Sequence, residues 1–297
     1  MSLGLEKNGT DPCIFNLFGK GTLTIAVYVD DLMILSNSAR TSDWLLEEST
    51  KKYDQLKITR GTIHNYLRIV FDLSQPPFIL INQQGMIEDI VSSTKTSVNT
   101  ATNTNSSIRS KFPHKTPAAP YLLDINTDSD LLPEPLQIIF HSTVAKLIFI
   151  STWIRQDLLT TISLQSKRIL HPPQEDWNKL QRALGYFENT KTQSLKLGIT
   201  IPLAIRTYKD ASFAVLSDYK SHTGICISLG VGIFYAKSTA QKINTISSCQ
   251  AEMVALSKGL LQSMFSAYFF GWSRLPYASN DRHINNQIIR TINLLLN

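Results

Sequence analysis

Cysteine is scarce in this sequence, and the three that occur lie far apart. Cys13, Cys226 and Cys249 form no Cys-x-x-Cys pair, and none stands at zinc-ligand spacing from a histidine or another cysteine. The sequence therefore predicts neither a disulfide framework nor a structural zinc site. A reducing compartment is the simplest interpretation of this cysteine usage.

Long apolar runs are missing as well. No uninterrupted apolar stretch reaches the roughly 18 residues that indicate a membrane span. The first residues, MSLGLEKNGTDPC, lack the features of a signal peptide. We therefore expect an intracellular chain, in the cytoplasm or nucleus, that is not secreted and has no membrane partner. Hydrophobic residues still make up 43% of the 297 residues, enough for a real core in one to three domains.

Acidic residues become rare in the last third. The chain carries 29 Lys and Arg against 23 Asp and Glu, a net charge of +6. From Ile205 onward the counts are 9 against 4, so +5 of the excess lies there. A local basic excess suits a polyanion such as nucleic acid. A basic surface that serves only solubility explains the same counts.

Aromatic residues are absent from residues 92–110, SSTKTSVNTATNTNSSIRS, which consist mainly of Ser, Thr and Asn. Such a segment buries too little apolar surface to offset the conformational entropy that ordering costs. Together with the proline-containing stretch that follows, it predicts a mobile linker over residues 92–135.

Apolar periodicity predicts regular elements on both sides of this linker. A helix at 41–56 is expected to be capped by Thr41 or Ser42, and the last helix by Ser247 or Ser248. The other expected helices are 84–93, 136–154, 157–170, 172–190 and, last in the chain, 247–272. Strands are expected at 65–74, at 78–83, at 203–215 and in GICISL and GIFYAKS, which GVG joins as a hairpin.

Two adjacent aspartates interrupt an otherwise apolar stretch, IAVYVDDLMILS at residues 25–36. In one continuous strand, Asp30 and Asp31 would point to opposite faces, and at least one carboxylate would enter the core unpaired. A hairpin with strands 25–29 and 32–35 instead places both at its tip. There they can share Mg²⁺, which takes one or two protein carboxylates besides substrate phosphates. An ordinary Asp-rich turn fits the same residues.

A second pair of acids lies in the last third. Asp210 ends an expected strand, and Glu252 lies in the first turns of the long helix. Glu252 shares a helix face with Ala255 and Gly259, which should pack on the sheet, so the two carboxylates could hold a metal ion between them. The alternative is a helix-start Glu that the helix macrodipole alone favours.

These segments together resemble one family, in family order and almost from end to end of the chain. The matching stretches include DPCIF, VYVDDLMILS, RGTIHNYLRIVFD, STVAKLIFISTWIRQD, LQRALGYFENT, YKDASFAV and NNQ. The longest and most specific is KSHTGICISLGVGIFYAKSTAQKINTISSCQAEMVAL. The chain resembles the C-terminal half of a copia-type retrotransposon polymerase polyprotein, in which a reverse transcriptase is followed by a ribonuclease H.

The resemblance implies roles at the matching positions. Asp30 and Asp31 match the adjacent carboxylates of the polymerase palm, and Asp210 and Glu252 match two carboxylates of the ribonuclease H site. Both sites would use Mg²⁺ in two-metal phosphoryl transfer. The expected partners are an RNA–DNA hybrid or other nucleic acid and the rest of such a polyprotein. The residues expected to bind nucleic acid are Lys220, His222, Lys237 and Lys242.

The sequence departs from the family at positions that matter for catalysis. The family's third palm carboxylate lies upstream of DPCIF, and Asn285 replaces the third ribonuclease H acid, unless a shifted register gives that place to Asp281. Arg68 replaces a glycine after YL, and Gln156 replaces the proline of RPD. We therefore expect an incomplete, inactive remnant of a reverse transcriptase and ribonuclease H. The alternative is a non-enzymatic protein that binds nucleic acid or a partner.

The expected fold class is α+β, in four successive parts. A partial reverse-transcriptase palm and thumb occupies residues 1–91, and the linker occupies 92–135. A helical connection follows at 136–200. The last part, 201–297, is expected to be a ribonuclease H-like domain that is truncated at its C-terminus.

Overall fold

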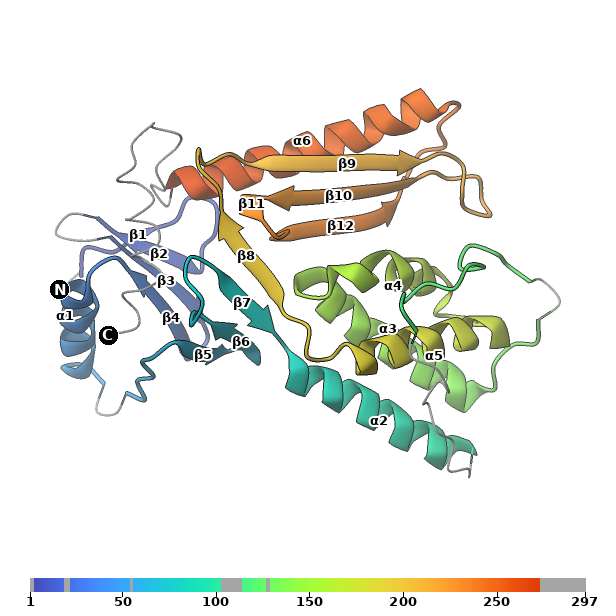
Figure 1. Cartoon of the computed structure of the whole chain (residues 1–297), viewed down its shortest axis with the longest axis horizontal. Coiled ribbons are helices and arrows are strands. Elements are labelled where there is room, and N and C mark those ends of the chain that lie inside the picture. Colours follow the sequence, from blue (N-terminus) through green and yellow to red (C-terminus); the bar gives the residue numbers. More distant parts are fainter. Residues whose placement is uncertain (1–2, 19–21, 54–55, 103–113, 127–128, 273–297) are drawn as a thin grey trace.

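The computed structural model describes residues 3–18, 22–53, 56–102, 114–126 and 129–272. Within these ranges the chain forms three antiparallel sheets and a group of packed helices, shown in Figure 1. Helices and strands are thus both present in quantity, which is compatible with the expected α+β class.

The first sheet is a four-stranded meander at the N-terminus. Its strands follow in the order β1 (Glu6–Lys7), β2 (Ile14–Leu17), β3 (Leu23–Tyr28) and β4 (Asp31–Ser36). Helix α1 (Ala39–Thr50) packs on it through Leu45, which is buried with Leu23 and Ile25. This helix begins after Ser38, so the prediction of a cap at Thr41 or Ser42 is wrong.

The second sheet joins segments that lie far apart in the sequence. Its strands run in the order β11 (Gly230–Val231), β8 (Leu195–Ile199), β7 (Ile79–Asn82), β6 (Ile69–Asp72) and β5 (Ile63–Tyr66). Ile79 pairs with Leu197, and Gly230 pairs with Ile199. The sequence patterns predicted neither β8 nor its pairing with β7.

The strand expected at 65–74 is a tight hairpin instead. Tyr66 pairs with Ile69, so Leu67 and Arg68 alone make the turn between β5 and β6. Both residues have positive φ, 52° and 64°. Two successive positive φ angles define the turn type that best matches the strand twist, and this type usually contains glycine or asparagine. Because neither Leu67 nor Arg68 is glycine or asparagine, the sequence pattern here resembled that of one continuous strand.

The helices form the largest apolar core. They are α2 (Gln84–Thr102), α3 (Glu134–Trp153), α4 (Leu159–Gln165) and α5 (Gln174–Asn189), with 3₁₀ helices η1 (Gln156–Leu158) and η2 (Ser166–Arg168). Helix α2 continues well past residue 93, and the linker prediction is therefore wrong for residues 92–102. Steps of three or four residues bury Ile87, Val91, Thr94 and Val98 along one face of the helix, and Thr94 forms a hydrogen bond with Thr143 of α3. Residues 103–113 lie outside the described residues.

Helix α3 is long and apolar enough to cross a membrane, judged by length and composition only. It is also a core helix here. Phe140, Val144, Leu147 and Ile150 are essentially inaccessible to solvent and pack against the other helices. Core helices of this kind are as apolar as many membrane spans.

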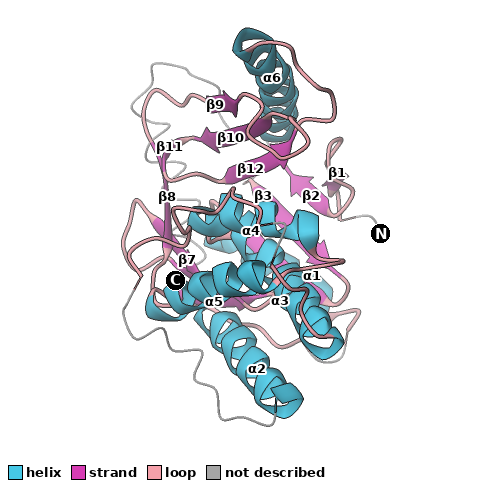
Figure 2. Ribbon diagram, turned by 90° about the vertical axis from the view of Figure 1, so that its right-hand side faces the viewer, coloured by secondary structure: helices cyan, strands magenta, loops and turns pink. Residues whose placement is uncertain are grey.

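The third sheet lies between helices. Its strands are β12 (Tyr235–Ala240), β10 (His222–Ser228) and β9 (Arg206–Ser212), and α6 (Ser248–Trp272) packs across β9 and β10. On the other side lies α4, as Figures 1 and 2 show. There Ser163 donates a hydrogen bond of 2.7 Å to the carbonyl of Ser238. Ser247 Oγ accepts a bond from the Gln250 amide, which confirms the predicted cap of α6.

The GVG segment forms more than the predicted hairpin turn. Gly230 and Val231 leave the third sheet and pair with β8 in the second. Gly232 has a φ of 73°, and a Cβ there would lie 2.0 Å from the carbonyl oxygen of Lys196. Only glycine allows two backbones to approach so closely. This backbone contact holds the second sheet against the third.

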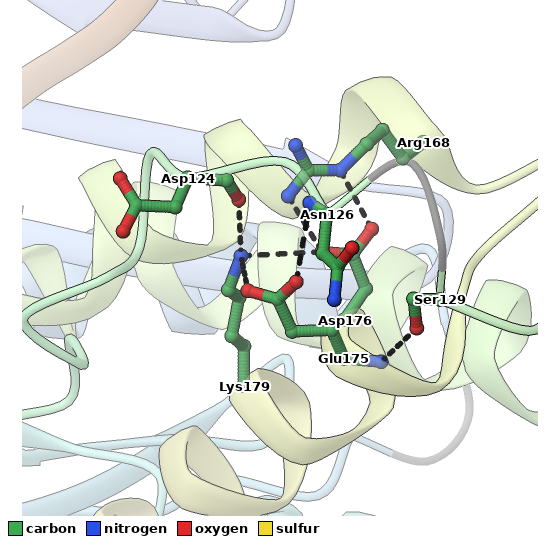
Figure 3. A network of polar contacts seen from close by, with 7 residues as sticks. All are labelled: Asp124, Asn126, Ser129, Arg168, Glu175, Asp176 and Lys179. Carbon is green, nitrogen blue, oxygen red and sulfur yellow. Dashed lines mark hydrogen bonds and ion pairs between the residues drawn. The ribbon is translucent and has the colours of Figure 1, made fainter.

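A buried polar network holds residues 124–126 and 129–130 against α5 (Figure 3). Lys179 is 1% exposed, and its Nζ lies 2.7 Å from the carbonyl of Asp124, 2.9 Å from Glu175 and 3.7 Å from Asp176. Arg168 donates two bonds of 2.6 Å to Asp176. Each buried charge therefore has an opposite partner, which offsets the cost of its desolvation.

We predict that Lys179→Met strongly destabilises the chain. The substitution keeps the apolar stem but leaves the carbonyl of Asp124 and the carboxylate of Glu175 without their cation. Removing one partner of a buried ion pair costs about 3 kcal/mol or more. The measurement is the unfolding free energy from urea titration. Lys51→Met is the control, because Lys51 pairs with Glu48 on the surface. Equal losses in both variants would contradict a special role for the buried network.

We predict that Arg68→Gly stabilises the β5–β6 hairpin. A left-handed conformation costs an ordinary residue on the order of 1 kcal/mol, whereas glycine adopts it without steric strain. The substitution also removes the Arg68–Asp89 ion pair, but both side chains are 64% exposed, so this loss is small. Asp89→Asn removes the same ion pair without changing the turn and serves as the control. A lower melting temperature for Arg68→Gly than for Asp89→Asn would refute the strain argument.

Candidate metal and nucleic-acid sites

The first candidate site is the tip of the β3–β4 hairpin. Tyr28 pairs with Asp31, so the turn consists of Val29 and Asp30. The predicted hairpin is thus confirmed, with Asp30 in the turn and Asp31 as the first residue of β4. Both aspartates are exposed, so neither carboxylate bears the desolvation cost that a continuous strand would impose.

Val29 gives this turn an unusual backbone. Its φ is 55° and its side chain is 86% exposed. A β-branched residue in the left-handed region is a true outlier, since glycine is the residue that usually begins such a turn. Strained positions of this kind concentrate at functional sites. The strain therefore marks the turn beside Asp30 and Asp31 as a candidate site.

Tyr66 of the second sheet lies close to this hairpin. Its hydroxyl donates a 3.5 Å hydrogen bond to the carbonyl of Ala26 in β3. Burial raises the pKa of the Tyr66 phenol, and the negative charges of Asp31 and Cys13 raise this pKa further. Strand β5, which ends at Tyr66, thus lies beside Asp31.

The second candidate site lies at the edge of the third sheet. Glu252 on α6 accepts a 3.1 Å hydrogen bond from the backbone N–H of Ala211, the residue after Asp210. In the described sheet β9 is an edge strand, so this N–H has no neighbouring strand to pair with. The structure therefore brings Glu252 to the segment of β9 that carries Asp210, and both residues are exposed.

The residues that the structure describes leave the surface beside Asp210 open. Asp210 pairs with Gly224 of β10, and Gly224 pairs with Ser238 of β12. A Cβ placed on Gly224 would meet no atom within 4 Å. A glycine inside a strand often marks the place where a ligand or another backbone comes close. The open strip in front of Asp210 is such a place.

Three lysines gather on the α6 side of this sheet. Burial lowers the pKa of Lys258, and the positive charges of Lys237 and Lys242 lower it further. Lys237 and Lys242, both expected to bind nucleic acid, are exposed. Sequence reasoning missed Lys258, because its position in the helix gave no sign that the chain would bring it to the other two. Together they favour the binding of an anion.

Lys220 and His222, the other two residues expected to bind nucleic acid, are engaged in contacts within the chain. Lys220 forms a 2.6 Å ion pair with Asp218. His222 is 8% exposed, and its Nε2 lies 2.7 Å from Ser238 Oγ. Burial, followed by the charges of Lys167 and Lys258, lowers the pKa of His222 to about 4, so the ring is neutral at pH 7. The prediction that His222 contacts nucleic acid does not agree with this burial.

The four carboxylates lie in two places, Asp30 and Asp31 on the hairpin of the first sheet and Asp210 and Glu252 at the third sheet. Among the residues that the structure describes, no group of three His, Cys, Asp or Glu side chains could hold a metal ion. Asn285 and Asp281, the alternatives for a third acid, lie outside the described residues. Each described site therefore offers two carboxylates.

Comparison with known proteins supports the resemblance at a coarse level. No protein-family model matches the chain. It is 25% identical over 259 residues to the Saccharomyces cerevisiae protein named "Putative transposon Ty5-1 protein", a match that covers 86% of this chain and 79% of that protein. It is 26% identical over 254 residues to the Arabidopsis thaliana "Retrovirus-related Pol polyprotein from transposon RE2". This second match covers 85% of the chain but only 16% of the polyprotein.

Both relatives carry transposon names, and both matches extend over most of the chain. The chain is therefore similar to retrotransposon proteins, one of them a polyprotein of which it spans a small part.

Proposed function

We propose that the chain is the reverse-transcriptase and ribonuclease H part of a retrotransposon polyprotein, and that it binds RNA–DNA hybrid with little catalysis. The observation that carries this proposal is the edge of the third sheet. Glu252 is held at the backbone of Ala211, the residue after Asp210, the described residues leave the strip at Gly224 open, and three lysines lie on the α6 side of the sheet. The similarity to transposon proteins supports a role in nucleic-acid metabolism.

The residues at this edge fit a magnesium ion. Mg²⁺ prefers oxygen ligands, keeps several waters and commonly binds one or two protein carboxylates together with phosphates. Asp210 and one oxygen of Glu252 would hold the ion, while the other oxygen keeps its bond to Ala211. The ion would supply charge for stabilising a phosphoryl transition state. The lysines would attract the nucleic-acid backbone, in a manner that weakens with salt.

We attribute the low activity to missing negative charge. Two dications at a phosphoryl-transfer site lie roughly 3.5–4 Å apart and repel each other. The described edge contributes two carboxylates, and the resemblance places the neutral Asn285 at the third position. A second ion would therefore bind weakly. Cleavage of hybrid should stay near background while binding persists.

A purely non-enzymatic nucleic-acid-binding protein is the second candidate. The exposure of Lys237 and Lys242 and their closeness to Lys258 favour binding with or without a metal. The two proposals differ in one measurable property. The first requires that a divalent ion binds at the edge and affects hybrid binding, and the second does not.

We predict that Glu252→Gln weakens Mn²⁺ and Mg²⁺ binding at least tenfold without destabilising the fold. Gln keeps an oxygen that can accept the Ala211 bond but loses the charge. One unit charge beside a dication at about 4 Å contributes about 2 kcal/mol even in water-like surroundings. The measurements are metal titration calorimetry, thermal unfolding, and hybrid binding by fluorescence anisotropy with and without Mg²⁺.

Asn285→Asp is the reverse variant and should tighten binding of the same ions. Glu175→Gln is the control, because Glu175 belongs to the Lys179 network and not to the sheet edge. If wild-type chain binds no divalent ion, or Glu252→Gln leaves metal binding unchanged, the metal site is wrong and the non-enzymatic candidate stands. If hybrid is cleaved well above background, the claim of low activity fails.

We predict that Gly224→Val preserves or raises stability but weakens hybrid binding. Valine suits a strand better than glycine, and the space around a new Cβ is open. The added methyl groups would fill the strip in front of Asp210. Anisotropy with labelled hybrid at low salt measures the effect.

Gly85→Ala is the matched control for this substitution. Gly85 lies in α2, where a Cβ also meets nothing within 4 Å, far from Asp210 in the sequence and in another part of the fold. It should leave hybrid affinity unchanged. Unchanged affinity in Gly224→Val would show that hybrid does not approach the sheet at Asp210.

A further inference from the structure

A buried polar cluster lies where the third sheet meets the beginning of α6. Its members come from β10, from the residue before β10 and from the connection between β12 and α6, and each is at most 6% exposed: Ser221, Thr223, Gln241 and Thr245. Ser221 Oγ lies 2.8 Å from Thr245 Oγ1, and the backbone N–H of Gln241 donates a 2.8 Å bond to the carbonyl of Ser221. Both bonds tie the connection that leads into α6 to the sheet.

The side chain of Gln241 joins the sheet to the helix. Its Nε2 donates a 3.0 Å bond to Thr223 Oγ1 in β10 and a 2.8 Å bond to the carbonyl of Ala251 in α6. A carbonyl can only accept, so the nitrogen and not the oxygen of the amide must face Ala251. A helix satisfies such a carbonyl by itself, through the N–H four residues further on, and the bond from Gln241 is therefore an additional one.

The two partners of Gln241 adjoin the two ends of another hydrogen bond. Ala251 directly precedes Glu252 in the helix, and Thr223 is the residue of β10 that pairs with Ala211 of β9. The side chain of Gln241 thus closes a ring of contacts, which the 3.1 Å bond from Ala211 to Glu252 completes. A shift of α6 along the sheet would break a bond in this ring.

Packing alone does not account for a glutamine at this position. Gln241 is 1% exposed, and its Oε1 has no hydrogen-bond partner among the residues that the structure describes. An unpartnered buried oxygen costs free energy, whereas an apolar side chain of the same length would fill the space without that cost. This cost indicates that the two bonds of the amide serve something besides the stability of the core.

We propose that Gln241 positions Glu252. Its amide holds Ala251 of α6 to Thr223 of β10. The carboxylate of Glu252 is thereby kept where the N–H of Ala211 donates to it. Gln241 acts through Glu252, so it is a positioning residue and not a ligand. Its effect on metal binding rests on the proposed function, whereas its effect on the placement of Glu252 does not.

The test is the NMR signal of the Ala211 amide in the full-length chain labelled with ¹⁵N-alanine. The chemical shift of an amide proton that donates to a carboxylate changes when the carboxylate takes up a proton, because bonds to charged acceptors are shorter and stronger. The part of this change that Glu252→Gln abolishes measures the contact between Glu252 and Ala211. Gln241→Met keeps the length of the side chain but donates no hydrogen bond. In this variant we expect that part to fall to about a third or less.

Two further variants separate positioning from a general loss of stability. Gln165→Met exchanges another buried glutamine, in α4, whose side chain has no hydrogen-bond partner within the described ranges, and it should leave the Ala211 signal unchanged. Thr223→Val removes one acceptor of Gln241 and should reduce the signal by about a third or more, even if Gln241→Met fails to fold. An unchanged signal in Thr223→Val or in folded Gln241→Met would overturn the proposal, and so would an equal loss in Gln165→Met.

A titration with Mn²⁺ shows separately whether this placement matters for metal binding. Gln241→Met should weaken Mn²⁺ binding at least threefold, because Glu252 would no longer be held in place. If the wild-type chain binds no divalent ion, the proposed function fails, while the Ala211 signal still decides whether Gln241 positions Glu252. If the wild-type chain binds Mn²⁺ and Gln241→Met loses the Ala211 signal without losing affinity, the effect of Gln241 on metal binding is refuted.

Discussion

The pairing of β7 with β8 determines how the rest of the chain is arranged. Ile79 to Ile81 pair with Leu197 to Leu195, directly before α2 begins and shortly after α5 ends. The helices between them must therefore close into one unit whose entry and exit lie side by side. The same strand β8 also pairs with β11, which belongs to the connection between β10 and β12. A single short strand thus fixes the helices and the third sheet relative to the first half of the chain.

Buried polar contacts reinforce this arrangement where the helices meet the third sheet. Arg155 is 3% exposed and donates two bonds to Asp157, a third to the carbonyl of Thr190 and a fourth to its hydroxyl. Burial alone would raise the pKa of Asp157, but the hydrogen bonding and the charge of Arg155, together with the hydrogen bond from Tyr186, outweigh it and lower that pKa. Gln156 donates a 3.0 Å bond to Ile233, so the residue at the family's proline position makes a contact that proline could not make.

Elements with a local cause could be predicted from the sequence, and elements that depend on a distant partner could not. The β3–β4 hairpin followed from the cost of burying adjacent aspartates, and the start of α6 followed from Ser247. Strand β8 is short, and only its partner β7, far away in the chain, makes it a strand. The last turns of α2 were not predicted, because only a few apolar residues, among many Ser, Thr and Asn, mark the buried face of the helix there. In the same way, Glu252 was expected near Asp210, whereas the burial of His222 and the approach of Lys258 to Lys237 depend on packing across elements.

The fold requires a hydrogen-bond acceptor at the position of Glu252, but it does not require a negative charge there. An edge strand leaves N–H groups without partners, and such donors need an acceptor or water. Glu252 supplies an acceptor for Ala211, so the fold accounts for an oxygen at this position. A neutral glutamine would satisfy the same donor, and the site is exposed, so the fold gains little from a full negative charge. The charge of Glu252, together with the open strip at Gly224, is the part that packing does not explain, and the cation that we propose would account for it.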